Sequence, residues 1–543
     1  MQNNNIKLNA YIRDQSAKRL GNKPSPYMCH KDQAETGVFF GYILEADGSI
    51  CYVGKPPDKD GHILIVGGAG AGKTSCIVIP TLREWKGTFF AIDVKGDLLD
   101  NVLPYMKSKR PTKVFEFTKN QDAEPKRCTY DPYDLLNKDD PDNVVRNARE
   151  IAQAIAPTPP QNPKEFWSNS AQTVLTGSLL YVNGLEEVDE DGKTLKGTFN
   201  DAMELIQSKP MYELIKDISK SGNANAIKHI MQYTGLENPE DNKMIAGINA
   251  ELSNNAMVFA TDNRVRAAFT ESDYMFRCED LEDHNVIMVV KEDKLDQWSR
   301  AITLVVTQII RYLERRPEKY SEGYNLPPVL LMLDEFPRLG KMDVILNAIA
   351  TLRSKGVTIC LAVQSIAQLD RIYGADNRRI IVDDCQYKAI LNVTDPENQR
   401  YFSDMIGTID VAKKSISETV SNSSGESSGS SHSSYRSSDI QRNYSDGKSQ
   451  SISSSFTVTT SLVREPIIFP HEMATLKDML LLTPEGFCRI RKLHYFQQLK
   501  QAQPTNQEQL RKPMSQTNWS GYNVKVITHP ILHKIKSLFT GEN

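Results

Sequence analysis

A glycine-rich loop between a short apolar strand and a helix limits the fold of this chain more than any other feature of its sequence. The run Gly67-Gly-Ala-Gly-Ala-Gly-Lys73-Thr74 follows the apolar stretch His62 to Val66 and precedes a helical pattern over Ser75 to Trp85. It has the fixed glycine, Gly-Lys pair and hydroxyl of a phosphate-binding loop, in the strand–loop–helix context that this motif requires. The pattern predicts an α/β fold with an anion site after its first core strand.

The loop also predicts a binding site for ATP and Mg²⁺. Its glycines let backbone N–H groups converge on phosphate oxygens, and the N-terminus of the following helix favours the same anion. Lys73 adds positive charge at the β- and γ-phosphates, and Thr74 offers its hydroxyl to Mg²⁺. The alternative is a glycine-rich turn without a ligand. The predicted nucleotide contacts are Gly67, Gly68, Ala69, Gly70, Ala71, Gly72, Lys73, Thr74 and Ser75.

A pair of acids follows another apolar strand. The run Val329 to Leu333 leads directly into Asp334 and Glu335, which is the Walker B pattern. Asp334 is predicted to hold Mg²⁺, directly or through water, and Glu335 to polarise the attacking water. Such a pair also occurs where a strand simply enters a loop. Its combination with the phosphate-binding loop favours hydrolysis, with Lys73 and Glu335 as catalytic residues.

Two further residues are candidates for the catalytic set. Gln364 ends the predicted strand Val357 to Val363, and in a parallel sheet this position lies beside the Walker B acids, where an amide can report the γ-phosphate. The alternative is an ordinary polar strand end. Arg353 precedes the same strand near the end of a helix, where a plain helix-terminal cation is the alternative to a catalytic arginine.

The order of strand and helix patterns predicts one α/β domain split by a helical one. Strands are expected at 88–93, 113–117, 285–290, 328–333 and 387–393, with helical patterns between them. This alternation is typical of a mostly parallel sheet, here that of a RecA-like P-loop NTPase domain. Between Asp142 and Phe276 the alternation stops and helical patterns dominate, which indicates an all-helical insertion.

These patterns divide the chain into seven segments. In chain order they are an N-terminal segment with short strands (1–60), the first part of the nucleotide-binding domain (61–140), the all-helical insertion (141–280), the second part of the nucleotide-binding domain (281–412), a Ser-rich disordered insertion (413–460), the final strands of the nucleotide-binding domain (461–497) and a basic C-terminal tail (498–543).

Composition excludes some classes of protein. The net charge of −3 rules out a globally basic nucleic-acid binder, so any DNA site has to be local. The eight cysteines form no close pair that would clip a metal, which favours a reducing cytoplasm. The polar stretch Met1 to Arg19 is no secretory signal, and no apolar run approaches the roughly 20 residues of a membrane span.

Two segments near the C-terminus have unusual composition. Serine makes up 19 of the 41 residues from Ser415 to Ser455, a stretch with too few apolar side chains to offset the entropy of ordering, so we expect disorder. Strand character on both flanks predicts a hairpin with a mobile tip.

From Arg489 to Asn543 there are nine lysines and arginines against two acids. This basic end is either solvated or a contact for nucleic acid or acidic lipid.

Taken together, the motifs resemble the type IV secretion coupling proteins of bacterial conjugation, the TraG/TraD-like DNA-transfer ATPases. The resemblance runs from about residue 37 to 496. Besides the two nucleotide motifs and Gln364-Ser365, it is carried by Ile79-Pro-Thr-Leu82, Ile92-Asp-Val-Lys-Gly-Asp97, Phe166-Trp167 with Ala171, Leu333 to Gly340, and Pro470-His-Glu472 with Leu476.

The resemblance implies a hexameric ATP-driven translocase that links a relaxase-bound DNA substrate to a secretion channel. It implies single-stranded DNA as the cargo, with double-stranded DNA as the alternative, and relaxosome and channel proteins as partners. It also gives Arg353 the role of an arginine finger that reaches the γ-phosphate in a neighbouring subunit. The family usually has N-terminal membrane helices, whereas this sequence begins with polar residues. We therefore expect a cytoplasmic protein whose contact with the inner face of the membrane is indirect.

Two other functions fit the same sequence. One is a related ring motor that moves DNA in segregation or packaging, and the other is an ATP-dependent adaptor that recruits protein cargo. DNA-stimulated ATPase activity separates a motor from an adaptor. Co-purification with a relaxase separates conjugation from segregation.

Overall fold

The computed structural model describes residues 23–106, 109–138, 141–158, 165–188, 194–235, 243–430, 444–498 and 525–526. The chain forms two compact units. The larger contains residues 22–400 and 470–543, and the smaller contains residues 1–21 and 401–469. The phosphate-binding loop and the Walker B acids both belong to the larger unit.

The strands of the larger unit are β1 (Cys29–His30), β2 (Val38–Leu44), β3 (Ile50–Lys55), β4 (Ile63–Val66), β5 (Thr88–Asp93), β6 (Thr112–Glu116), β7 (Arg127–Tyr130), β8 (Glu186–Val188), β9 (Thr194–Lys196), β10 (Met275–Phe276), β11 (Asn285–Val289), β12 (Val329–Leu333), β13 (Val357–Val363), β14 (Tyr387–Ile390), β17 (Met479–Thr483), β18 (Gly486–Ile490), β19 (Gln497–Gln498) and β20 (Lys525–Val526).

Its α-helices are α2 (Ile79–Glu84), α3 (Asp97–Asn101), α4 (Leu103–Met106), α5 (Asp134–Lys138), α6 (Pro141–Ile155), α7 (Glu165–Asn183), α8 (Phe199–Ser208), α9 (Met211–Lys220), α10 (Ala224–Ile230), α11 (Lys243–Thr261), α12 (Asn263–Ala268), α13 (Leu295–Glu314), α14 (Asp343–Thr351), α15 (Ile366–Tyr373) and α16 (Ala375–Asp384). Short helical turns include η3 (Lys73–Val78), η7 (Phe336–Leu339) and η8 (Leu352–Lys355). Helix α17 (Pro396–Ile406) runs across the boundary between the units.

Eleven strands form the main sheet, in the order β10-β7-β6-β11-β5-β12-β13-β4-β14-β17-β18. Every pair from β10 to β14 is parallel, and only β17 and β18 add antiparallel pairs at one edge. Strands β4 and β13 are in register up to their last residues, Val66 and Val363. The loops that begin at Gly67 and Gln364 therefore leave the sheet side by side.

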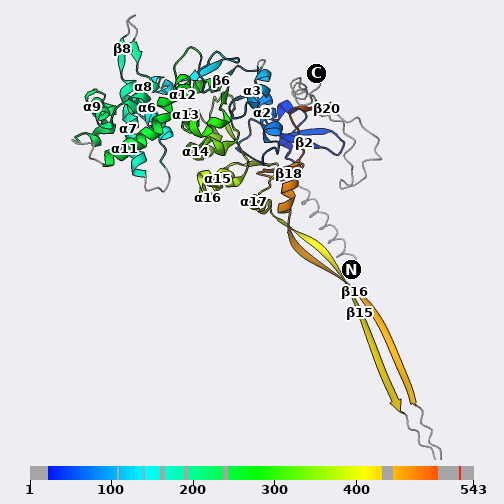
Figure 1. Ribbon diagram of the computed structural model, residues 1–543. Coiled ribbons are helices and arrows are strands. Elements are labelled where there is room, and N and C mark those ends of the chain that lie inside the picture. The colour runs from blue at the N-terminus through cyan, green and yellow to red at the C-terminus, as the bar shows by residue number, and fades with distance from the viewer. Residues whose placement is uncertain are drawn as a thin grey trace, which may run out of the picture. The chain divides into compact units, whose positions relative to one another are not determined.

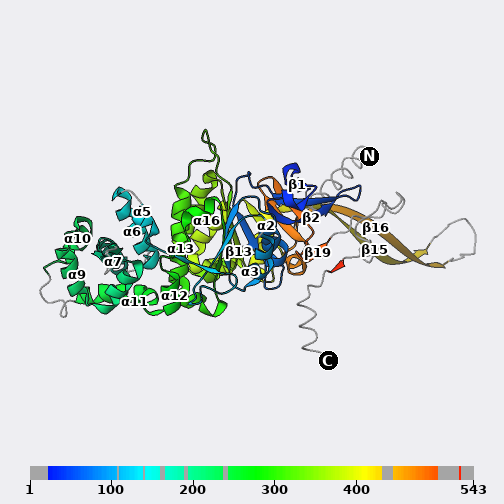
Figure 2. The same ribbon diagram turned by 90° about the horizontal axis from the view of Figure 1, so that it is seen from above.

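The central strands are buried along their whole length because helices cover both faces of the sheet. Every residue of β4, β5, β12 and β13 is buried, as is typical of parallel strands between two helical layers. Figure 2 shows α13 and α16 on one side of β13, with α2 and α3 on the other. The carboxyl ends of these strands form a rigid edge from which functional loops can project.

A smaller antiparallel sheet, in the order β1-β3-β2, also belongs to the larger unit. Its strand β2 meets the chain again after β18, where Tyr42 and Arg491 exchange backbone hydrogen bonds of 3.0 and 2.9 Å. This bridge fixes the direction in which the chain leaves the last strand of the main sheet.

The inserted segment is mainly helical, and α6 to α11 gather into one cluster (Figure 1). The expectation that it is purely helical is wrong in two places. Strands β8 and β9 pair as a short antiparallel hairpin, and β10 joins the main sheet beside β7. Each of these strands has only two or three residues, too few for an alternating pattern to be visible in the sequence.

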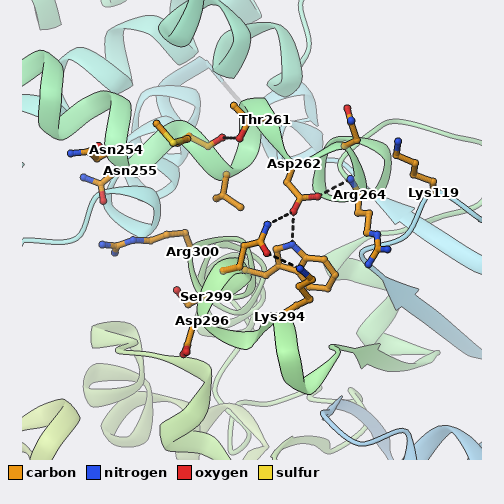
Figure 3. Close-up of a pocket in the computed structure, with 15 residues that line it drawn as sticks. Lys119, Asn254, Asn255, Thr261, Asp262, Arg264, Lys294, Asp296, Ser299 and Arg300 are labelled. Atoms are coloured by element: carbon orange, nitrogen blue, oxygen red, sulfur yellow. Dashed lines mark hydrogen bonds between the residues drawn. The ribbon is translucent and has the colours of Figure 1, made fainter.

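One carboxylate connects the helical insertion to α13, the long helix that follows β11 (Figure 3). Asp262 accepts hydrogen bonds from the backbone N–H groups of Arg264 and Val265 at the start of α12, at 2.8 and 3.3 Å. It also accepts bonds of 2.8 Å from the side chains of Gln297 and Trp298. Burial raises the pKa of Asp262, but the bonds from Trp298 and the two N–H groups outweigh burial and lower it. The carboxylate is thus charged at neutral pH.

A cavity of about 700 Å³ surrounds Asp262, lined from α11, α12, the start of α13 and Lys119. The ring of Trp298 is fully buried beside it and meets Phe117 edge to face, with centroids 5.2 Å apart. This cavity marks the junction between the insertion and the nucleotide-binding part of the unit.

The smaller unit is built on a long two-stranded ribbon. Strand β15 (Thr408–Ser430) pairs antiparallel with β16 (Tyr444–Pro466) from Thr408↔Pro466 to Ser430↔Tyr444 without a break in register. The sequence-based expectation of disorder from Ser415 to Ser455 is therefore wrong for the residues described on both strands. The ladder rests on backbone hydrogen bonds, which serine forms as well as any residue. The expected mobile tip, residues 431–443, lies outside the described residues.

Candidate active site

The phosphate-binding loop takes a conformation that only glycine adopts readily at two positions. Gly70 and Gly72 have φ of +72° and +100°, in the left-handed region. At Gly67 a β-carbon would lie 3.1 to 3.2 Å from the side chains of Ala71 and Leu391, so this position is crowded as well. The N–H of Cys76 donates to Gly72 O at 2.8 Å, which continues the loop directly into η3. The result is a helix N-terminus aimed at the loop.

The two predicted metal ligands lie together. Thr74 Oγ1 donates a 2.8 Å hydrogen bond to Asp334 Oδ2, although the residues are 260 positions apart in the chain. Asp334 is only 9% exposed. Burial raises the pKa of this carboxyl group, while the bond from Thr74 and the charge of Lys73 oppose that shift. A buried carboxylate beside a hydroxyl provides the hard oxygen ligands that Mg²⁺ prefers, so these residues fit the ion.

The second Walker B acid points toward Gln364. Gln364 Nε2 donates to Glu335 Oε2 at 2.7 Å, and Lys95 Nζ lies 3.7 Å from Glu335 Oε1. Glu335 is the non-glycine residue with positive φ among those described, at +51°. Its own N–H donates to Asp334 Oδ1 at 2.9 Å. A left-handed turn thus divides the acid pair, with Asp334 directed to Thr74 and Glu335 to Gln364.

Lys73 is buried among the loop's own oxygens. Its Nζ donates to Gly67 O at 2.7 Å and to Gly68 O at 3.4 Å. Burial lowers the pKa of Lys73, and the charges of Glu335 and Asp334 counteract that shift. The ammonium group is therefore placed between the loop and the two acids, where it can neutralise an anion held by the loop.

A cavity of about 320 Å³ opens in front of these groups. Its lining consists of Ala69, Gly70, Ala71, Gly72, Lys73, Thr74, Ser75, Ile79, Lys95, Asp97, Glu335, Tyr495 and Phe496. The structure thus brings seven residues of the predicted nucleotide-binding loop and Glu335 to one cavity. Asp334 and Gln364 lie directly behind it through their bonds to Thr74 and Glu335.

Arg353 does not join this group. It is exposed on η8, before the first residue of β13, whereas Gln364 follows the last residue of the same strand. The charge of Arg353 acts on the carboxyl group of Asp60, just before β4. Burial raises the pKa of Asp60, but hydrogen bonds from Tyr320 and Lys319 and the charges of Lys319 and Arg353 together lower it. Within one chain, Arg353 lies at the opposite edge of the sheet from the phosphate-binding loop.

Five residues that line the cavity were not assigned to the site from the sequence, namely Ile79, Lys95, Asp97, Tyr495 and Phe496. Ile79 and Asp97 belong to motifs that carry the family resemblance. Lys95 was noted only as part of a motif, and its link to Glu335 depends on β5 lying next to β12. Tyr495 and Phe496 come more than 400 residues after the loop, and no spacing rule connects them to it. The one local signal is an aromatic pair a few residues after the last strand of the main sheet, and such pairs are too common to be informative.

Comparison with known proteins identifies the family to which the chain belongs. The sequence profile described as "Type IV secretory system Conjugative DNA transfer" matches residues 15–443, more than half of the chain. The chain belongs to this family. The resemblance expected from the sequence motifs is thereby confirmed. No helix among the residues that the structure describes is both long and apolar enough to cross a bilayer.

Individual relatives of the conjugative DNA transfer family are distant. VirD4 of Rhizobium rhizogenes is 26% identical over 349 residues, which cover 64% of this chain and 49% of VirD4. The conjugal transfer protein TraG of Escherichia coli is 22% identical over 394 residues, covering 70% of this chain and 60% of TraG. The chain thus spans about half the length of the first of these curated relatives.

Solved structures confirm the fold. The bacterial conjugative coupling protein TrwB, in an unbound form, superimposes with a TM-score of 0.56 at 15% identity, covering 88% of this chain and 90% of that one. TrwB in complex with ADP and Mg²⁺ gives 0.56 as well, covering 90% and 94%. The RecA-like P-loop fold with a mostly parallel sheet, expected from the order of elements, is correct.

Proposed function

We propose that this chain is an ATP-driven DNA translocase that acts as the coupling protein of a conjugative type IV secretion system. The observation that carries the ATPase part is the pairing of Thr74 with Asp334 and of Glu335 with Gln364 at the mouth of the phosphate-binding loop. A site that only bound a nucleotide would not need a second buried acid, Glu335, hydrogen-bonded to the amide of Gln364. Family membership supports conjugative DNA transfer as the process.

Each residue has a separate role in the proposed hydrolysis. Backbone N–H groups of residues 67–75 hold the phosphates, and Lys73 balances their charge. Thr74 and Asp334 hold Mg²⁺, which neutralises charge on the phosphate oxygens when it is bound there. Glu335 orients the attacking water and accepts its proton, and Gln364 keeps that carboxylate in place. In support, the fold relative TrwB has been solved with ADP and Mg²⁺ and with a non-hydrolysable ATP analogue.

The proposed assembly is a homo-hexameric ring around DNA. It receives the strand from a relaxase, passes it to the secretion channel, and works at the inner face of the cell membrane through a partner protein. Family membership and the position of Arg353, remote from its own chain's site, support a ring in which neighbouring chains complete each active site. Cytoplasmic location and the partners are part of the same proposal.

The decisive experiment measures ATP hydrolysis by the purified chain with and without single-stranded and double-stranded DNA. A DNA motor is expected to hydrolyse ATP faster with DNA, and Lys73→Ala to lose this activity because the charge at the phosphates is gone. A wild-type chain that hydrolyses no ATP under any of these conditions refutes the ATPase. ATP hydrolysis at the same rate with and without either kind of DNA contradicts translocation and favours an adaptor.

A further inference from the structure

After β18, the last strand of the main sheet, the chain returns to the phosphate-binding loop and contacts it. We call residues 491–497, which follow β18, the closing segment. Arg491 is held by its bridge to Tyr42, and Lys492 Nζ donates to Ala71 O at 3.3 Å. The N–H of Tyr495 donates to Ser75 O at 2.9 Å. Backbone and side chain together fix the closing segment to the loop.

His494 strengthens this connection. Its Nδ1 lies 2.9 Å from Ser75 Oγ and 3.3 Å from Cys76 Sγ, both in the first turn after the loop lysine. A β-carbon at Gly72 would come within 3.5 Å of the His494 ring, so the imidazole lies directly against the loop. The segment therefore has a defined position relative to the phosphate site.

Three rings of the closing segment are packed together at the cavity. His494 and Phe496 stack with centroids 5.1 Å apart and planes at 19°, and Tyr495 meets Phe496 edge to face at 5.2 Å. The guanidinium of Arg83 lies 4.7 Å from the Tyr495 ring, which holds that ring from α2. Phe496 is nevertheless 38% exposed. An ordered cluster that leaves a phenylalanine in water, in a wall of the nucleotide cavity, is suited to covering a flat ligand.

We propose that Tyr495 and Phe496 form the base subsite of this nucleotide site, where the purine ring of the bound nucleotide stacks. The inference rests on the proposed ATPase function and names the part of the site that the motifs leave open. The phosphate-binding loop, with Lys73 and Thr74, and Asp334 behind it provide the groups for phosphates and metal. Among the residues lining the cavity, only Tyr495 and Phe496 offer aromatic faces. Stacking on an aromatic ring uses the π-face that every base has. The subsite should thus accept adenine and guanine alike.

The test separates base binding from phosphate binding by titrating two ligands in the presence of Mg²⁺. ADP carries a base, whereas inorganic pyrophosphate presents a similar diphosphate without one. By isothermal titration calorimetry, the double variant Tyr495→Ala/Phe496→Ala should bind ADP and GDP about tenfold more weakly, in line with typical base–aromatic stacking. Its affinity for pyrophosphate should change by less than about twofold, because the loop is intact.

Two control variants sharpen the result. Tyr495→Phe keeps the ring and should keep the affinity for ADP. Tyr320→Ala removes an exposed tyrosine that does not line this cavity, and should leave both ligands unaffected. Unchanged ADP affinity in the double variant overturns the base subsite. A parallel loss of ADP and pyrophosphate also overturns it, because the closing segment would then only support the loop. If the wild-type chain binds neither ligand, the proposed ATPase function fails first.

Discussion

Glu335 has a left-handed backbone, which costs a residue with a β-carbon roughly 1–2 kcal/mol. Such strain persists where the surrounding structure over-determines it, and it is concentrated at functional sites. Here the turn aims the carboxylate at Gln364 and away from Asp334, which serves Thr74. The unusual backbone is therefore part of how two adjacent acids obtain different tasks.

The variant Glu335→Gln tests that division. We expect it to bind ATP and Mg²⁺ as the wild type does, because Asp334 and Thr74 are unchanged, and to lose hydrolysis by a factor of about 10² to 10⁴, as is typical when a general base is removed. Binding is measured by calorimetry and turnover by phosphate release. Loss of nucleotide affinity along with turnover would assign Glu335 a structural role instead.

The environment of Lys55 leads to a second prediction, on how stability depends on pH. It lies at the end of β3 with no exposed surface, and its Nζ donates to Thr358 Oγ1 at 3.1 Å. Burial, helped by the charge of Lys319, lowers the pKa of Lys55 to about 7, while Asp60 and Asp58 oppose the shift. In the unfolded chain this lysine keeps its proton until about pH 10.5. Between these values the unfolded state binds more protons, so stability due to Lys55 rises with pH.

We therefore expect Lys55→Met to abolish the part of the pH dependence of the free energy of unfolding that this lysine causes. In the wild type the Lys55 contribution to the free energy of unfolding should increase by up to about 1.4 kcal/mol per pH unit above pH 7. Urea unfolding of both proteins at pH 7 and pH 8.5 measures it, and the difference between them isolates Lys55 from other groups. Equal slopes in the two proteins would show that the lysine is charged in the folded state.

At the level of whole elements, the β15–β16 ribbon has few buried apolar residues among those whose side chains the structure describes. Among the residues of this unit whose side chains the structure describes, the buried aliphatic ones are Ile409 in β15 and Ile468 just after β16, at the same end of the ladder. Two-stranded ribbons without a packed face contribute little stability. The ribbon should thus be dispensable for folding, whatever it contacts in an assembly.

Deletion of residues 415–455 tests this. Lys414 pairs with Thr460 in the ladder, so the deletion leaves four residues, 456–459, to form a new turn. We expect Tm to change by about 2 °C or less, which corresponds to under about 1 kcal/mol, with basal ATPase retained. A large fall in Tm, measured by differential scanning calorimetry, would show that the ribbon is an integral part of the core.

The elements also show where sequence patterns suffice. Gly67 to Thr74, Asp334 and Gln364 each follow a buried strand, and a parallel sheet brings such strand ends to one edge, so their meeting could be predicted. Helix α11 lies within the segment expected to be helical, but Gly247 in its interior is not explained by a helical pattern. That glycine is explained only by packing, since the Trp167 ring occupies the place of its β-carbon. The position of Tyr495 likewise depends on strand order, which no local pattern encodes.

At the scale of the whole molecule, the length of β13 separates Arg353 from Gln364. Seven residues of extended strand span roughly 20 Å. An arginine at the amino edge of the sheet cannot reach phosphates at the carboxyl edge of the same chain. If Arg353 acts in catalysis, it acts in a neighbouring subunit, where such a residue accelerates hydrolysis by a factor of about 10³ to 10⁵.

Mixing two inactive variants tests this arrangement. Lys73→Ala and Arg353→Ala should each be nearly inactive, but a mixture should partly recover ATPase activity, because some interfaces then pair an intact loop with an intact arginine. Purified Lys73→Ala is titrated into Arg353→Ala with DNA present to promote assembly. Absence of recovery in mixtures shown to co-assemble would leave Arg353 as a cation of its own chain.

The contact between His494 and Ser75 also has a consequence for biosynthesis. It joins residues 419 positions apart, and a ribosome working at about 5–20 residues per second makes the second partner roughly 20 to 80 seconds after the first. Throughout that interval the nascent chain has its phosphate loop but not the wall that covers it. We expect chains that end before Tyr495 to bind ADP about tenfold more weakly than the full chain, so that prematurely terminated chains compete poorly for nucleotide in the cell.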